Sequence, residues 1–264
     1  MKRLLLFVLL GCLFLAPALA DRPVDKTVAA DPDGEVSVEL IAGTVHVIGW
    51  DRSEVQVTGV VGDDVEEVEV VSRGGDVSIE VKLPDHDDDS SDSRSFNDAD
   101  ADLEIHVPAD CLVEVEGISA DITVEGVRGA VDLESISGEI EVDGAMQEAE
   151  VATVSGDIVL SSAEALREGE FESVSGNITV RAALVDGDFS FETVSGNVEL
   201  HLPGNTSASF DIETFSGRIE NEFGPEAERT SEYAPGKELE FTTGGGDAQV
   251  EIESFSGRIE LRVD

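Results

Sequence analysis

The sequence predicts an all-β protein, a single-domain parallel β-solenoid (β-helix) built from stacked coils of about 20 residues. Three observations support this. A Ser-Gly unit recurs along residues 136–261 with a period near 20. Apolar and polar residues alternate with a period of two inside each copy, as they do in a strand with one buried face. No segment of about 12 residues in the body of the chain shows the 3.6-residue period of an amphipathic helix.

The first element is a predicted secretory signal peptide at residues 1–20, MKRLLLFVLLGCLFLAPALA. Lys2 and Arg3 precede an apolar run, and Ala18-Leu19-Ala20 supplies the small residues that a signal peptidase recognises. The run is shorter than the roughly 20 apolar residues of a membrane-spanning helix, and no later segment approaches that length. We therefore expect an exported protein, in the periplasm, on the outer cell surface or secreted, with no transmembrane segment after cleavage.

The two cysteines leave one alternative open. Leu9-Leu10-Gly11-Cys12 loosely resembles the lipobox of bacterial lipoproteins, in which case Cys12 would carry a lipid. If residues 1–20 are removed instead, Cys111 remains alone and forms no internal disulfide. We interpret Cys111 as a small packed residue of a strand.

Charge excludes one class of partner. Without the signal peptide the chain has 14 basic and 59 acidic residues, a formal charge of −45. Nucleic acid is therefore not an expected partner. A surface this acidic suits either ordinary solvation or a saline habitat in which salt screens the self-repulsion.

The predicted solenoid domain covers residues 34–264, after an N-terminal linker or cap at residues 21–33. Its first part is less regular, with strands expected at residues 34–40, 43–50, 54–61, 65–71, 76–83 and 102–107. Two polar insertions, at residues 85–99 and 221–237, interrupt the pattern and are expected to be loops on the solenoid wall.

The regular copies begin at ISADITV (118–124) and continue as ISGEIEV, VSGDIVL, VSGNITV, VSGNVEL, FSGRIEN and FSGRIEL. Their serines lie at 119, 137, 155, 175, 195, 216 and 256. The last step, of 40 residues, is two periods long, and we expect residues 242–250 to occupy the place of a missing copy.

Stacking of the copies in chain order predicts two inward columns, one of Leu133, Val151, Phe171, Phe191, Ile212 and Ile252 and one of Ile140, Ile158, Ile178, Val198, Ile219 and Ile259. The Ser-Gly units are expected at the corners, where glycine accepts strained dihedral angles. Phenylalanines become frequent toward the C-terminal half, which predicts a thicker core there; they include Phe215 and Phe255.

Three segments carry a family resemblance: GTVHVIGWDRSEVQVTG at 43–59, the recurring [V/F]SGxIxV units, and TTGGGDAQVEIESFSGRIEL at 242–261. They resemble the bacterial "putative adhesin" family, a group of exported or membrane-tethered β-solenoid domains of unknown function. The resemblance covers roughly residues 34–264. It implies a parallel β-solenoid at the cell envelope and supplies no catalytic residues.

Candidate metal ligands are abundant but match no template. Asp85, Asp87, Asp88, Asp89 and Asp92 offer the oxygen ligands that Ca²⁺ prefers. With Asp85 as position 1, an EF-hand would need glycine at Ser90 and glutamate at Phe96. The sequence therefore indicates at most a weak Ca²⁺ site in this loop, and no other cofactor.

A second acidic feature is one outward column, expected to contain Glu134, Glu172, Glu192, Glu213 and Glu253, with Ala152 as an exception. Carboxylates about 5 Å apart repel by roughly 0.8 kcal/mol per pair in water. The column is either a solvated strand face or a face that collects cations.

We conclude that the sequence favours a non-enzymatic, adhesin-like binding module of the cell envelope or the medium, whose ligand is an unknown protein or glycan. One alternative is an envelope scaffold that self-associates through its coil ends, since the chain stops inside an expected terminal strand. The other is a β-helical enzyme acting on polysaccharide. No group of acids with a basic residue breaks the columns at one place, which disfavours the enzyme.

Overall fold

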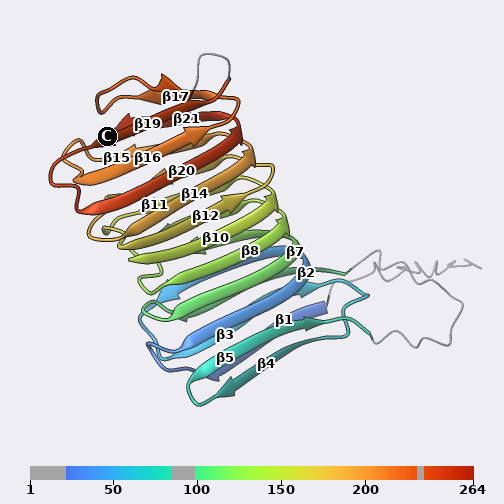
Figure 1. Cartoon of the computed structure of the whole chain (residues 1–264). Helices are drawn as coiled ribbons and strands as arrows, with labels where there is room; N and C mark the ends of the chain where they lie inside the picture. Colours follow the sequence, from blue (N-terminus) through green and yellow to red (C-terminus); the bar gives the residue numbers. More distant parts are fainter. Residues whose placement is uncertain (1–21, 85–98, 231–234) are drawn as a thin grey trace, which may run out of the picture.

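The computed structural model describes residues 22–84, 99–230 and 235–264. Within these ranges the regular secondary structure is entirely β, and the strands stack into an elongated solenoid (Figure 1). No helix in the described ranges is long and apolar enough to cross a membrane. The predicted fold class, a largely parallel β-solenoid forming one domain, is confirmed.

The strands fall into two groups. The N-terminal group consists of β1 (Arg22–Ala29), β2 (Glu35–Trp50), β3 (Glu54–Val61), β4 (Glu67–Arg73), β5 (Asp76–Lys82), β6 (Asp100–Pro108) and β7 (Leu112–Glu125). The C-terminal group consists of β8 (Val131–Ser137), β9 (Ile140–Gly144), β10 (Glu148–Ser155), β11 (Ile158–Ser162), β12 (Glu168–Ser173), β13 (Ile178–Arg181), β14 (Asp188–Ser195), β15 (Val198–Leu202), β16 (Ala208–Thr214), β17 (Arg218–Asn221), β18 (Glu228–Arg229), β19 (Lys237–Thr242), β20 (Ala248–Ser256) and β21 (Arg258–Val263).

Each coil is one strand, a bend and a second strand, so the sheet folds into two halves that enclose the core. The first half contains β8, β10, β12, β14, β20 and β16 as parallel neighbours. The second half contains β9, β11, β13, β15, β21 and β17, also parallel. The long strands β2 and β7 run through the bend and belong to both halves.

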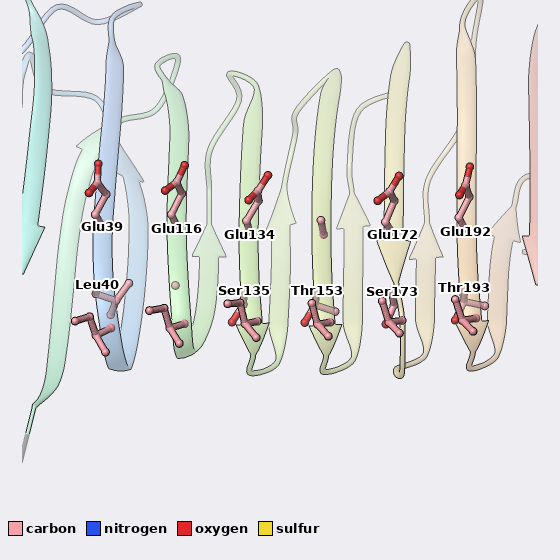
Figure 2. Close-up of a pocket in the computed structure, with 18 of the residues that line it drawn as sticks. Glu39, Leu40, Glu116, Glu134, Ser135, Thr153, Glu172, Ser173, Glu192 and Thr193 are labelled. Carbon is pink, nitrogen blue, oxygen red and sulfur yellow. The ribbon is translucent and has the colours of Figure 1, made fainter. Parts of the chain in front are cut away.

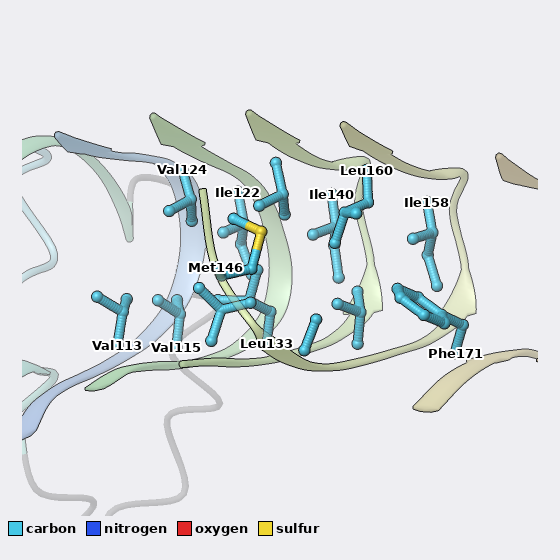
Figure 3. Packing of buried hydrophobic residues seen from close by; sticks show 14 of the residues in the cluster. Val113, Val115, Ile122, Val124, Leu133, Ile140, Met146, Ile158, Leu160 and Phe171 are labelled. Carbon is cyan, nitrogen blue, oxygen red and sulfur yellow. The ribbon is translucent and has the colours of Figure 1, made fainter. Parts of the chain in front are cut away.

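Side chains from both halves fill the space between them. Figure 3 shows Ile122, Ile140 and Ile158 projecting toward Val115, Leu133 and Phe171 of the first half. These side chains are almost fully buried. Because neighbouring coils share one register, like residues stack: the rings of Phe171 and Phe191 lie 5.0 Å apart at 5°. The predicted membership of both inward columns is therefore confirmed.

The order of the coils differs from the expected one. The last coil, β20–β21, lies between β14–β15 and β16–β17, so that Ser195 pairs with Ser256. The copy at Ser216 is the outermost, although it precedes Ser256 in the chain. Local pattern could not reveal this order, because FDIETFSGRIEN (210–221) and VEIESFSGRIEL (250–261) present nearly the same side chains to their neighbours.

The intervening segment covers the outermost coil instead of replacing a missing copy. β19 pairs antiparallel with β16, and β18 pairs antiparallel with β19. Residues 242–250 are the end of β19, a turn and the start of β20. At the N-terminal end, β1 pairs antiparallel with β3, and β4 with β5. The C-terminal strand β21 is thus an interior strand, and the expectation that the chain stops at an open coil edge is wrong.

The corner glycines are required by close approach and only in one case by a positive φ. Among the corner glycines Gly138 has φ 154°. At Gly176 and Gly196 a Cβ would lie 1.7 Å and 1.8 Å from the carbonyl oxygen of the corner glycine one coil below. A Cβ on Gly257 would meet Gly196 in the same way, at 1.7 Å. At this corner the backbones of neighbouring coils are too close to leave room for a side chain. This corrects the expectation that glycine is needed there for strained dihedral angles.

Candidate functional site: an acidic and apolar groove

The outer surface of the first half carries three parallel rows, because alternate residues of each strand point outward. In β8 these are Asp132, Glu134 and, at the bend, Ile136. Register repeats these three positions on every coil. The rows run along the solenoid axis with a spacing of about 4.8 Å per strand.

The middle row, which we call the glutamate row, extends the predicted column in both directions. Figure 2 shows Glu39, Glu116, Glu134, Glu172 and Glu192 in one line. In spatial order the row contains Glu80, Glu39, Glu116, Glu134, Ala152, Glu172, Glu192, Glu253 and Glu213. The expected grouping of five glutamates around Ala152 is confirmed, with Glu253 ahead of Glu213.

The row at the bend, which we call the apolar row, consists of Ile41, Ile118, Ile136, Val154, Val174, Val194, Phe255 and Phe215. These are eight of the ten large apolar side chains that are exposed in the described ranges. Phe215 and Phe255 are 59% and 57% exposed, and their rings stack 4.8 Å apart. Their assignment to a thicker core is therefore wrong: they continue an outward apolar row.

The glutamate row and the apolar row are the walls of a groove of about 1220 Å³. It crosses nine neighbouring strands from β5 to β16, roughly 38 Å at about 4.8 Å per strand. Its floor is the backbone between the rows, at Ser135, Thr153, Ser173, Thr193 and Ser254. Their side chains are buried at the bend, and all of these hydroxyls except that of Ser135 lack a hydrogen-bond partner in the described structure.

Within the described residues, most glutamates of this groove have no cationic partner. Lys82, at one end of the groove, pairs with Glu69 and Glu80. The other glutamates of the row form no ion pair with a described lysine, arginine or histidine. Partial burial, and then the neighbouring carboxylates, raise the pKa values of Glu116, Glu172 and Glu253. A nearby positive charge would stabilise the ionised form of these three carboxylates.

The second half of the sheet shows the opposite arrangement. Arg258 and Arg262 pair with Glu260, and Arg262 also pairs with Glu222 at 3.0 Å. His201 lies 3.0 Å from Glu199 and 3.1 Å from Asp264. In the described ranges, Arg258 and Arg262 thus pair with acids of the second half and form no ion pair with the glutamate row.

A further acidic row lies on the far side of the glutamate row from the apolar one. This mixed acidic row contains Glu114, Asp132, Glu150, Glu170, Ser190, Glu251 and Asp211. Desolvation by burial, then Glu150 and Glu114, raise the pKa of Asp132 to about 6. No apolar row borders it, and it lines a second, more polar depression of about 990 Å³.

Other candidates from the sequence lie elsewhere. Asp85, Asp87, Asp88, Asp89 and Asp92 fall outside the described residues, so the Ca²⁺ hypothesis stays a prediction. Within the described ranges no group of three or more His, Cys, Asp or Glu residues is arranged to hold a metal ion. Cys111 is buried, and burial raises the pKa of its thiol to about 12, which fits a packed residue.

The apolar row was missed from the sequence although its signal is present. The residue before each Ser-Gly is Ile, Val or Phe in every copy. Alternate residues of a strand share a face, so Ile136, two residues after the outward Glu134, is also expected to point outward. The prediction that small residues form the corner ends the alternation before Ile136, so it does not place an apolar side chain there.

These features define a parallel β-solenoid with a straight, open groove along one face. The chain belongs to the Toastrack DUF4097 family, whose model matches residues 33–262. This confirms the family resemblance.

Among solved structures, the chain is similar to a "putative cell adhesion protein" from Clostridium sporogenes, at 12% identity and a TM-score of 0.40 over 92% of this chain and 100% of that chain. It is also similar to a "putative adhesin" from Bacteroides fragilis, at 10% identity and a TM-score of 0.45 over 92% and 98% of the two chains. A "putative adhesin" from Parabacteroides distasonis matches at 12% identity and a TM-score of 0.36, again over 92% and 98%. None of the curated proteins is a significant match.

Proposed function

We propose that this protein is an exported, non-enzymatic, adhesin-like binding module and that the groove is its ligand-binding surface. The observation that carries the proposal is the apolar row: large apolar side chains are normally exposed singly, and here eight lie in one line beside a line of carboxylates. A continuous exposed apolar surface rimmed by polar groups is typical of an interaction site.

The geometry suits a ligand that is held by many weak contacts. Each coil adds one apolar side chain and, except at Ala152, one carboxylate at a fixed spacing. A ligand that spans several coils gains affinity from the number of contacts. The rigid stack holds the rows in place without the ligand, which reduces the entropy lost on binding.

The experiment compares adhesion of the mature protein and a groove variant to intact bacterial cells. The variant carries Val154→Thr, Val174→Thr and Val194→Thr, which keep the β-branched shape of three neighbouring members of the apolar row. Its matched control carries Val60→Thr, Val159→Thr and Val263→Thr on strands outside the groove. We expect cell-bound fluorescence of the labelled groove variant to fall at least tenfold and that of the control to stay within twofold of wild type.

The same assay separates the groove from the insertions. An alternative hypothesis is that the ligand contacts lie in the polar insertions at residues 85–99 and 221–237, because these insertions interrupt the repeat. If a chain lacking residues 86–97 loses adhesion while the groove variant keeps it, the groove proposal is wrong and that insertion is the site. Circular dichroism of each variant establishes that the solenoid is folded.

A further inference from the structure

We infer that the groove takes a cationic amphipathic helix, a polypeptide segment with one apolar stripe and an adjacent stripe of lysine or arginine. This inference rests on the proposed function and names the chemistry of the ligand. It is argued from the pairing of rows, their spacing and the missing counter-charges.

The pairing of the rows requires two kinds of contact from one ligand. A purely cationic ligand would satisfy the glutamate row but leave the apolar row in water, and a purely apolar ligand would desolvate carboxylates without pairing them. Burial of unpaired carboxylates is unfavourable. A ligand with apolar and basic groups side by side satisfies both walls.

The spacing favours a helix over an extended strand. Same-face side chains of an extended chain recur about every 6.7 Å, whereas an α-helix advances 5.4 Å per turn and the groove rows repeat at about 4.8 Å. The helix pitch exceeds the row spacing by roughly 0.6 Å per turn, so after four turns the helix is displaced by only about half of one coil spacing. Long flexible lysine or arginine side chains absorb an offset of this size. An amphipathic helix laid in an apolar groove is a common mode of peptide recognition.

Charge argues against a second copy of the chain as the occupant. Two grooves facing each other would bring two glutamate rows together, and the chain without residues 1–20 has a formal charge of −45. Lys82, at one end of the groove, does not offset this repulsion, because it is already paired with Glu69 and Glu80. A foreign cationic segment carries no such penalty.

The test measures binding of a synthetic 15-residue helical peptide, with one leucine stripe flanked by lysines, to the mature protein by fluorescence anisotropy in 150 mM NaCl. The comparison peptides are a scrambled peptide of the same composition and an analogue with glutamate in place of lysine. We expect the helical peptide to bind at least tenfold more tightly than the scrambled one and the glutamate analogue not to bind.

Two sets of charge variants locate the contact. Glu172→Gln, Glu192→Gln and Glu253→Gln together remove three charges from the glutamate row, and we expect about tenfold weaker binding. Glu150→Gln, Glu170→Gln and Glu251→Gln remove the same charge from the mixed acidic row, farther from the apolar row, and we expect less than threefold weakening. The variant with Val154→Thr, Val174→Thr and Val194→Thr should weaken binding at least tenfold.

Four outcomes would overturn the inference. Equal binding of the scrambled and helical peptides, or equal effects of the two charge sets, would leave only general attraction to an acidic surface. Dimerisation of wild type, but not of the valine-to-threonine variant, in sedimentation velocity would identify a second copy as the occupant. If that variant loses cell adhesion while wild type binds no peptide, the proposed function survives and the cationic helix is wrong.

Discussion

Asp132 shows how the position of one side chain in a row changes its chemistry. It lies between Glu114 and Glu150 in the mixed acidic row and beside Glu134 in the glutamate row. Burial and then these carboxylates raise its pKa to about 6 from an ordinary value of 3.8. The folded protein therefore takes up a proton at this site at a higher pH than the unfolded chain does. Stability contributed by the protonated form is lost as the pH rises from about 4 through 6.

This predicts a pH-dependent effect of Asp132→Asn. Above pH 6 the variant lacks the unfavourable charge, so its melting temperature at pH 7.5 should exceed that of wild type by about 2–4 °C, the shift that roughly 1 kcal/mol gives in a domain of this size. The side chain is partly exposed, so solvent screening keeps the effect modest. Below pH 4 both forms are neutral, and the difference should vanish in calorimetric scans. An equal gain at pH 7.5 and pH 3.8 would show that the carboxylate charge is not the cause.

At the scale of elements, the coil β20–β21 occupies a place that the order of the chain does not predict. Ile252 lies between Phe191 and Ile212 in one inward column. Ile259 lies between Val198 and Ile219 in the other. β16–β17 is therefore joined to the rest of the stack through the C-terminal coil. Substitution of a charge at Ile259 or Leu261, both fully buried, would disturb this interior coil and not a free end.

Disulfide trapping tests this order directly. Ser195 and Ser256 are exposed partners on adjacent parallel strands, which suits the Cα separation of 4.4–6.8 Å that disulfides require. Ser195 and Ser216 lie two strands apart, roughly 9.6 Å, which is too far. We expect Ser195→Cys with Ser256→Cys to oxidise fully and Ser195→Cys with Ser216→Cys to remain free, as measured by intact mass under non-reducing conditions. The reverse pattern would support stacking in chain order.

Period and alternation predicted the solenoid, the inward columns and the glutamate row, because these depend only on residues at fixed spacing within one coil. The position of β20–β21 depends on which of two nearly identical coils, at 210–221 and 250–261, stacks on β14–β15. The local sequence pattern does not distinguish them. The groove was half predicted: the carboxylates of Glu134 and Glu172 were placed, but the apolar wall at Ile136 and Val174 was not.

At the scale of the whole molecule, charge is distributed unequally between the two halves of the sheet. Arg258 and Arg262 neutralise acids of the second half, while the glutamate row and the mixed acidic row face solvent together on the first. Ligand binding and stability are therefore linked. The repulsion that destabilises the free solenoid is the same interaction that a cationic ligand relieves.

Salt should also reduce the repulsion between the carboxylates and so raise the stability of the free protein. The Debye length falls from about 10 Å at 0.1 M to about 3 Å at 1 M, below the spacing of about 4.8 Å between neighbouring carboxylates of a row. The melting temperature of the mature protein should therefore rise by several degrees between 0.1 M and 1 M NaCl. The melting temperature of the variant with Glu172→Gln, Glu192→Gln and Glu253→Gln should be higher at 0.1 M and should rise less with salt, because fewer like charges remain to be screened.

CaCl₂ at matched ionic strength should raise the melting temperature as much as NaCl if only screening acts. An additional rise below 1 mM CaCl₂ that a chelator reverses would instead support the Ca²⁺ site predicted at Asp85–Asp92, whereas a melting temperature that does not change with salt would show that the acidic rows do not limit stability.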